Sequence, residues 1–159
     1  MSKPDYLNSL INDLLEVLWE EHGTGVRYRT TLVGTTYFKE RYGDRLIGKT
    51  WRETVEAVLL ALKQEGLIAE AALEAEGYLL RVTFRGCRHL ETERLLLGKG
   101  MKVFSCQCAN VVMYFLDRLV GKYSELATVE VGENECTATF CVMGTALSAS
   151  GESSNPTAE

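Results

Sequence analysis

The five cysteines are the side chains with the widest chemical range in this chain of 159 residues. Cys87 lies in Gly86-Cys87-Arg88-His89, a glycine-bounded connector of the kind that often carries functional groups. A neighbouring Arg88 or His89 would lower the pKa of the Cys87 thiol and make it reactive. Cys87 and His89 could also ligate a metal or haem, or hold a linear tetrapyrrole through a thioether. The alternative, which we favour, is a surface loop in which the two residues are neighbours by chance.

The other four cysteines, Cys106, Cys108, Cys136 and Cys141, lie in apolar runs. We interpret them as small buried hydrophobic side chains. Five is an odd number in a chain large enough to form its own core, which argues for reduced thiols and against a disulfide framework. The N-terminal segment MSKPDYLNS lacks the apolar core of a signal peptide. We therefore expect a cytoplasmic protein.

Catalytic motifs with a known mechanism are missing from the sequence, which has no nucleophile elbow, Walker loop or dinucleotide-binding glycine pattern. We interpret the acids Glu91 and Glu93 as solvated charges. An apolar small-molecule pocket is the remaining kind of site. We expect it to be lined by four aromatic side chains, Tyr37, Phe38, Tyr114 and Phe115.

The composition is that of an ordinary globular protein, with 46% hydrophobic and 25% charged residues. The net charge is −5, and lysines and arginines are interspersed among acids, so nucleic acid is not expected as a partner. The longest apolar stretch, 102–122, is interrupted by Gln107, Asn110, Asp117 and Arg118. This interruption and its length argue against a membrane span.

The stretch 102–122 is instead expected to form a long, buried central helix. Its apolar residues recur at helical spacing, and the opposite face is also largely apolar. Phe115 lies in the middle of the main stripe. The expected buried face of a first helix is formed by its regularly spaced aliphatic side chains, Leu7, Leu10, Ile11, Leu14, Leu15 and Leu18.

Periodicity and turn residues predict the remaining elements. We expect helices over 4–22, 30–42, 50–66 and 90–97, and hairpins over 67–84 and 125–143. Helices and strands are segregated along the chain, which predicts an α+β fold with an antiparallel sheet of two hairpins. Residues 1–144 should form one domain, and the polar tail 145–159 should be disordered.

The chain resembles the 4-vinyl reductase-like domain, whose superfamily includes core TRAPP vesicle-tethering subunits and the ligand domains of aromatic-sensing transcription activators. Four features carry the likeness: the entry bounded by Gly43 and Gly48, the strand LLRVTF at 79–84, the helix FSCQCANVVMYFLDRLVG and the ending VEVGENECTATFCV. The resemblance implies a domain that binds a small apolar molecule under the sheet, often as a dimer. Some relatives are linked to tetrapyrrole chemistry.

The resemblance also implies a structural zinc, held by one helix cysteine, a glutamate and two hairpin cysteines. Carried over, the set is Cys108 or Cys106, with Glu133, Cys136 and Cys141. Residues 136 and 141 are five apart and would point to opposite faces of one strand. Residues 106 and 108 would diverge by about 200° on one helix. We therefore favour packing over zinc.

The resulting hypothesis is a homodimeric, non-enzymatic binding domain for a small hydrophobic or tetrapyrrole-like molecule. It would act in sensing or in assembly, together with a protein partner. The first alternative is a dimerising protein-interaction adaptor with no small-molecule role. The second is an enzyme of tetrapyrrole metabolism.

Overall fold

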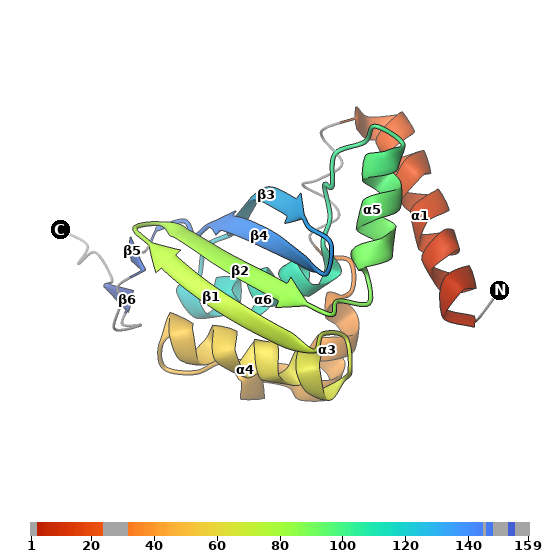
Figure 1. Ribbon diagram of the computed structural model, residues 1–159. Coiled ribbons are helices and arrows are strands. Elements are labelled where there is room, and N and C mark those ends of the chain that lie inside the picture. The colour runs from red at the N-terminus through yellow and green to blue at the C-terminus, as the bar shows by residue number, and fades with distance from the viewer. Residues whose placement is uncertain (1–2, 24–31, 145, 148–152, 155–159) are drawn as a thin grey trace.

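The computed structural model describes residues 3–23, 32–144, 146–147 and 153–154. The expected α+β class is confirmed (Figure 1). The helices are α1 (Lys3–His22), α3 (Thr35–Tyr42), the 3-10 helix η2 (Gly43–Leu46), α4 (Trp51–Gln64), α5 (Leu90–Gly98) and α6 (Gln107–Val120). The strands are β1 (Glu70–Glu76), β2 (Leu79–Arg85), β3 (Glu125–Val131), β4 (Glu135–Cys141), β5 (Ala146–Leu147) and β6 (Ser153–Ser154).

The main sheet consists of the two expected hairpins, joined side by side through β2 and β4. Its order is β1-β2-β4-β3 and every pair is antiparallel, so β1 and β3 form the edges. Strand β2 alternates as predicted, with Leu80, Val82 and Phe84 completely buried. The edge strands expose acidic side chains, Glu74 and Glu76 on β1 and Glu130 on β3.

Helix α6 lies beside α4, against one face of this sheet (Figure 1). Its buried side follows the predicted stripe and includes Val111, Val112 and Phe115. The helix begins at Gln107, whereas the sequence pattern predicted a start near residue 102. Cys106 is the N-cap, with φ −124° and ψ 114°, so the chain enters α6 in an extended conformation. Gly121 ends the helix in the left-handed region, with φ +76°.

The start of α4 follows the predicted capping pattern. The Thr50 side chain accepts the backbone N–H of Glu53 at 3.2 Å. The Glu53 carboxylate accepts the backbone N–H of Lys49 at 2.8 Å. The first bond pairs an amide of the first turn, and the second pairs the amide of Lys49, one residue before the N–H that Glu53 would accept in a standard capping box.

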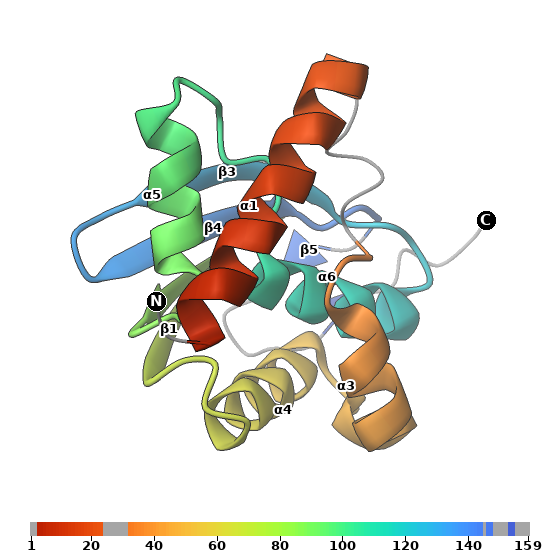
Figure 2. The same ribbon diagram turned by 90° about the vertical axis from the view of Figure 1, so that its right-hand side faces the viewer.

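Helix α1 packs on α5 at one end of the sheet (Figure 2). Leu15 lies in a small core with Leu96 and Phe104. The expected buried face of α1 is wrong in part, because Leu7, Leu10 and Leu14 are exposed, whereas Ile11 and Leu18 are partly buried against the same core as Leu15. Helix α5 makes the main contact with α1, so one narrow stripe is enough to bury its contact side.

The structured part of the chain extends past residue 144, the expected domain boundary. Strand β5 pairs with β6, the backbone N–H of Leu147 donates to the carbonyl of Gly77 at 2.7 Å, and Leu147 is buried. The rest of the predicted tail, 145, 148–152 and 155–159, lies outside the described residues, as does the predicted helical start at 30–31. Across the described ranges, no helix has the length and apolarity needed to cross a bilayer.

Candidate functional site

A tight turn after β2 places Cys87 inside the molecule. Gly86 has φ +62°, and a Cβ at this position would lie 2.8 Å from the Cβ of Ala69. A side chain at Gly86 would therefore be strained both by its backbone and by its neighbour. The backbone N–H of Arg88 donates to the carbonyl of Leu67 at 3.0 Å and holds the turn. Cys87 is buried, so the expectation of a surface loop is wrong for this thiol.

The N-terminus of α6 brings two further thiols to the same place. Cys106 and Cys108 are both completely buried. The two side chains were expected to diverge because both residues were placed on one continuous helix. This expectation does not apply, since Cys106 precedes the helix and has an extended backbone. The Sγ atoms of Cys108 and Cys87 are 3.8 Å apart.

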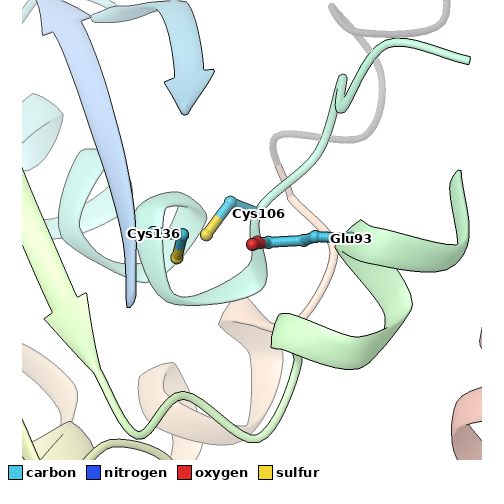
Figure 3. A group of neighbouring side chains, drawn as sticks. All are labelled: Glu93, Cys106 and Cys136. Carbon is cyan, nitrogen blue, oxygen red and sulfur yellow. The ribbon is translucent and has the colours of Figure 1, made fainter. Parts of the chain in front are cut away.

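Cys136 and Glu93 complete the cluster (Figure 3). Cys136 comes from β4, where it pairs with Phe84, and Glu93 points inward from α5. A carboxylate oxygen of Glu93 and the Sγ atoms of Cys106 and Cys136 all lie within 4.8 Å of one another. Neither oxygen of Glu93 has a hydrogen-bond partner among the residues that the structure describes, although the side chain is only 1% exposed. We call Cys87, Cys106, Cys108, Cys136 and Glu93 the thiol cluster.

Two residues of the zinc set carried over from the resemblance lie outside this cluster. Glu133 is exposed in the turn between β3 and β4. Cys141 is half-buried, and its Sγ lies 3.8 Å from the Sδ of Met143. Its distance of five residues from Cys136 places it on the other face of β4 and at the other end, as the strand geometry predicts. The structure therefore brings Cys108 and Cys136 to the cluster without Glu133 and Cys141.

Burial and thiol contacts shift the proton affinities of the cluster. The thiol contacts from Cys108 and Cys136, together with the backbone N–H of His89, lower the pKa of Cys87 to about 3. The contact with Cys87 and burial raise the pKa of Cys108 well above its ordinary value. Burial raises the pKa of Glu93 to about 7 and lowers that of His89. The cluster thus favours one thiolate, on Cys87, beside a carboxyl that is close to its titration midpoint at neutral pH.

The donor set of the cluster fits a thiophilic divalent ion such as zinc. Glu93, Cys106 and Cys136 form a compact group of one oxygen and two sulfur ligands, and Cys87, which contacts Cys136 but lies outside that group, would supply the third sulfur of a tetrahedral zinc site. A buried carboxylate without a hydrogen-bond partner costs free energy that a bound cation would offset. When bound, such an ion would tie together α5, the turn at Cys87, the start of α6 and β4.

An apolar cavity of about 470 Å³ lies next to the cluster, between α1, α3, α4 and α6. Four predicted site residues are in its wall, namely Tyr37, Phe38, His89 and Cys108. At its edge, the Glu65 carboxylate accepts the hydroxyl of Tyr37 at 2.7 Å. Phe115 does not line the cavity, because it is buried in the main core. Tyr114 lines a separate hollow of about 860 Å³, at the C-terminal end of α6.

Sequence reasoning missed Glu93 as a buried group. The burial of Glu93 could have been inferred from its spacing. It lies three residues from both Leu90 and Leu96, which are buried on the same side of α5. Residues three apart share one helix face, so an acid between two buried leucines lies on the buried side.

No protein-family model, curated protein or solved structure matches this chain. The resemblance to the 4-vinyl reductase-like domain stays an expectation, and the function must be inferred from the thiol cluster and the cavity.

Proposed function

We propose that this protein is a non-enzymatic binding domain for a small, neutral, apolar molecule, acting in sensing or assembly. The ligand would occupy the 470 Å³ cavity, and a metal ion in the thiol cluster would fix one of its walls. The observation that carries the proposal is the position of Cys108, which lines the cavity and also contacts Cys87 of the cluster. Binding in the cavity and order in the cluster are therefore coupled through one side chain.

The wall of the cavity favours a neutral apolar ligand over a tetrapyrrole. Its volume lies in the range of small-molecule sites, which are mostly apolar with a few polar groups. Glu65 already accepts hydrogen bonds from Tyr37 and Tyr42 and pairs with Arg41. No lysine or arginine is among the described residues that line the cavity. The propionate groups of a tetrapyrrole would thus enter near a carboxylate and without a cationic partner in the wall.

We predict that Val33→Trp weakens ligand binding. Val33 lies in the cavity wall and is 42% exposed, so a larger side chain there can fill the entrance without entering the core. The measurement is calorimetric titration of the full chain with neutral alkylphenols and straight-chain alcohols, and with haem. We expect binding of at least one neutral series, no binding of haem, and an affinity loss of at least about tenfold in Val33→Trp, which corresponds to about 1.4 kcal/mol.

The matched control is Leu32→Trp. Leu32 is the preceding residue, is 65% exposed and lines the separate hollow beside Tyr114. This variant should bind like the parent. Equal affinities in the parent and Val33→Trp, or tight binding of haem alone, would contradict the proposed cavity.

The alternative of a dimerising adaptor is favoured by one observation, the exposed apolar stripe on α1. Leu7, Leu10, Leu14 and Val17 are between 43% and 58% exposed and recur at intervals of three and four residues. This spacing is that of the contact positions in a two-helix coiled coil. A second copy of α1 would therefore cover the stripe.

We predict a homodimer whose contact includes this stripe. Light scattering at micromolar concentration should give about twice the chain mass of 17.7 kDa. Leu14→Glu should reduce it to one chain mass because it places a charge in the contact. Asp13→Gln is the control, since Asp13 is exposed beside Leu14 but outside the stripe. A monomeric parent would rule this contact out.

A further inference from the structure

The thiol cluster offers five ligands, and a tetrahedral metal ion takes four. Glu93, Cys106 and Cys136 form one compact group. Cys87 adjoins that group through its contact with Cys136. Cys108 is the remaining thiol, and it is the one that lines the cavity. Cys108 is thus a fourth thiol, which contacts the candidate metal ligand Cys87 and lies in the wall of the cavity.

The geometry of Cys87 and Cys108 suits a reversible disulfide. Their Sγ atoms are in van der Waals contact at 3.8 Å, although the residues are 21 apart in sequence. Cys108 is anchored in the first turn of α6, whereas Cys87 belongs to the turn between β2 and α5. A turn can adjust its backbone more easily than a helix or strand, so the pair can reach bonding distance without disturbing the sheet.

We propose that Cys87 and Cys108 form a disulfide when an apolar organic hydroperoxide enters the cavity, and that this modification releases the metal ion from the cluster. The release rests on the proposed function, since it needs a metal held in part by Cys87. The formation of the disulfide does not need the metal. The apolar wall selects an alkyl hydroperoxide over hydrogen peroxide, because the alkyl group occupies the cavity as the neutral ligand would.

The reaction balances as a two-electron oxidation of the two sulfurs. The Cys87 thiolate attacks the terminal oxygen of the hydroperoxide and forms a sulfenic acid, while the O–O bond breaks. The alkoxide takes a proton from solvent and leaves as the alcohol. The sulfur of Cys108 then attacks the Cys87 sulfur, the S–S bond forms, and the oxygen leaves as water with the proton of Cys108. A small-molecule thiol restores both residues by exchange.

Loss of Cys87 from the donor set leaves Cys106, Cys136 and Glu93. Three ligands hold the ion less tightly than four, and the disulfide sulfur is no longer a thiolate. Oxidation at the cavity wall would therefore cause the release of a metal ion from the interior, without a change in the fold of the sheet.

The test is treatment of the reduced full chain, with and without bound zinc, with one equivalent of cumene hydroperoxide. Intact mass spectrometry should show the loss of two hydrogen atoms, peptide mapping should join Cys87 to Cys108, and a chromogenic chelator should detect zinc release. Hydrogen peroxide should react at least about tenfold more slowly. Val33→Trp should slow the cumene hydroperoxide reaction, because it fills the entrance of the cavity.

Two variants make the assignment specific. Cys108→Ser should stop at a sulfenic acid on Cys87, which gains one oxygen atom and is trapped by a dione reagent. Cys141→Ser is the control and should behave like the parent, because Cys141 lies outside the cluster. A disulfide between Cys106 and Cys136, or an unchanged mass under conditions that oxidise free N-acetylcysteine, would overturn the proposal. A Cys87–Cys108 disulfide in a chain that never binds zinc would instead refute the metal part of the proposed function alone.

Discussion

Phe115→Ala is expected to lower the free energy of unfolding by about 3–5 kcal/mol, the usual cost of removing a buried phenylalanine ring. Phe115 is 1% exposed and lies on α6, in the main core. Since a domain of this size has a total stability of about 5–15 kcal/mol, the variant should lose a large part of it. Thermal unfolding followed by circular dichroism should show a decrease of Tm on the order of 10 °C.

Tyr114→Ala is the matched control for this prediction. Tyr114 is the preceding residue and contacts Phe115 edge-on, with ring centroids 5.1 Å apart, but it is only half-buried and lines the hollow outside the core. Its truncation should cost clearly less than that of Phe115. Equal losses in the two variants would mean that the two sides of α6 are packed alike, against the arrangement described above.

Glu93→Gln is expected to have opposite effects on the metal-free and the zinc-bound protein. In the metal-free chain, burial raises the pKa of Glu93 from an ordinary value of 4.5 to about 7. Above pH 4.5 the unfolded chain therefore releases this proton, while the folded chain keeps it until about pH 7. The unfolded state binds fewer protons across this interval, so the contribution of Glu93 to stability falls as the pH rises.

Gln cannot ionise, so the variant avoids this loss. Its stability relative to the parent should be similar near pH 4 and should rise between about pH 4.5 and 7, reaching at most about 3 kcal/mol at pH 8. In the presence of zinc the parent should be more stable than the variant, because Gln lacks the negative charge of a carboxylate ligand. We expect the variant to bind zinc at least about tenfold more weakly, the lower end of the losses seen for outer-shell partners of metal ligands.

Denaturant unfolding at pH 4, 6 and 8, with and without one equivalent of zinc, measures both effects. Glu91→Gln serves as the control, since Glu91 is exposed on the same turn of α5. If Glu93→Gln is the less stable protein at pH 8 in the presence of a chelator, Glu93 is not the buried, unpaired acid described here. If zinc stabilises parent and variant equally, Glu93 is not a ligand.

The fold was largely predictable because its signals are local. The alternation of Leu80, Val82 and Phe84 marks a strand with one buried face, and Thr50 with Glu53 marks the start of α4. The side of α1 that is buried was less predictable, since Leu14 and Leu15 are both apolar. Only the contact with α5 decides that Leu15 is buried and Leu14 is not.

The sequence indicated which residue types could form the candidate site, but not which individual residues come together in it. Cys87 lies next to Arg88 and His89 in sequence, which indicates a surface loop, yet the backbone at Gly86 turns the thiol inward. Cys106 and Cys108 were expected to diverge, but the position of the helix start at Gln107 brings both to the cluster. Contacts between α5, α6 and β4 depend on tertiary packing, which the periodicity of a single segment does not contain.

The acidic edges of the sheet also limit how copies of this protein can meet. An exposed edge strand offers unpaired amides and carbonyls to any other strand, and charged side chains are a common protection. Here β1 carries Glu74 and Glu76 and β3 carries Glu130, so two copies approaching edge to edge would bring like charges together. Growth of a continuous sheet from molecule to molecule is thereby disfavoured, most strongly at low ionic strength. The homodimer proposed above would instead use the exposed stripe on α1, on the helical side of the molecule, and such a contact would close on a pair instead of extending into a fibre.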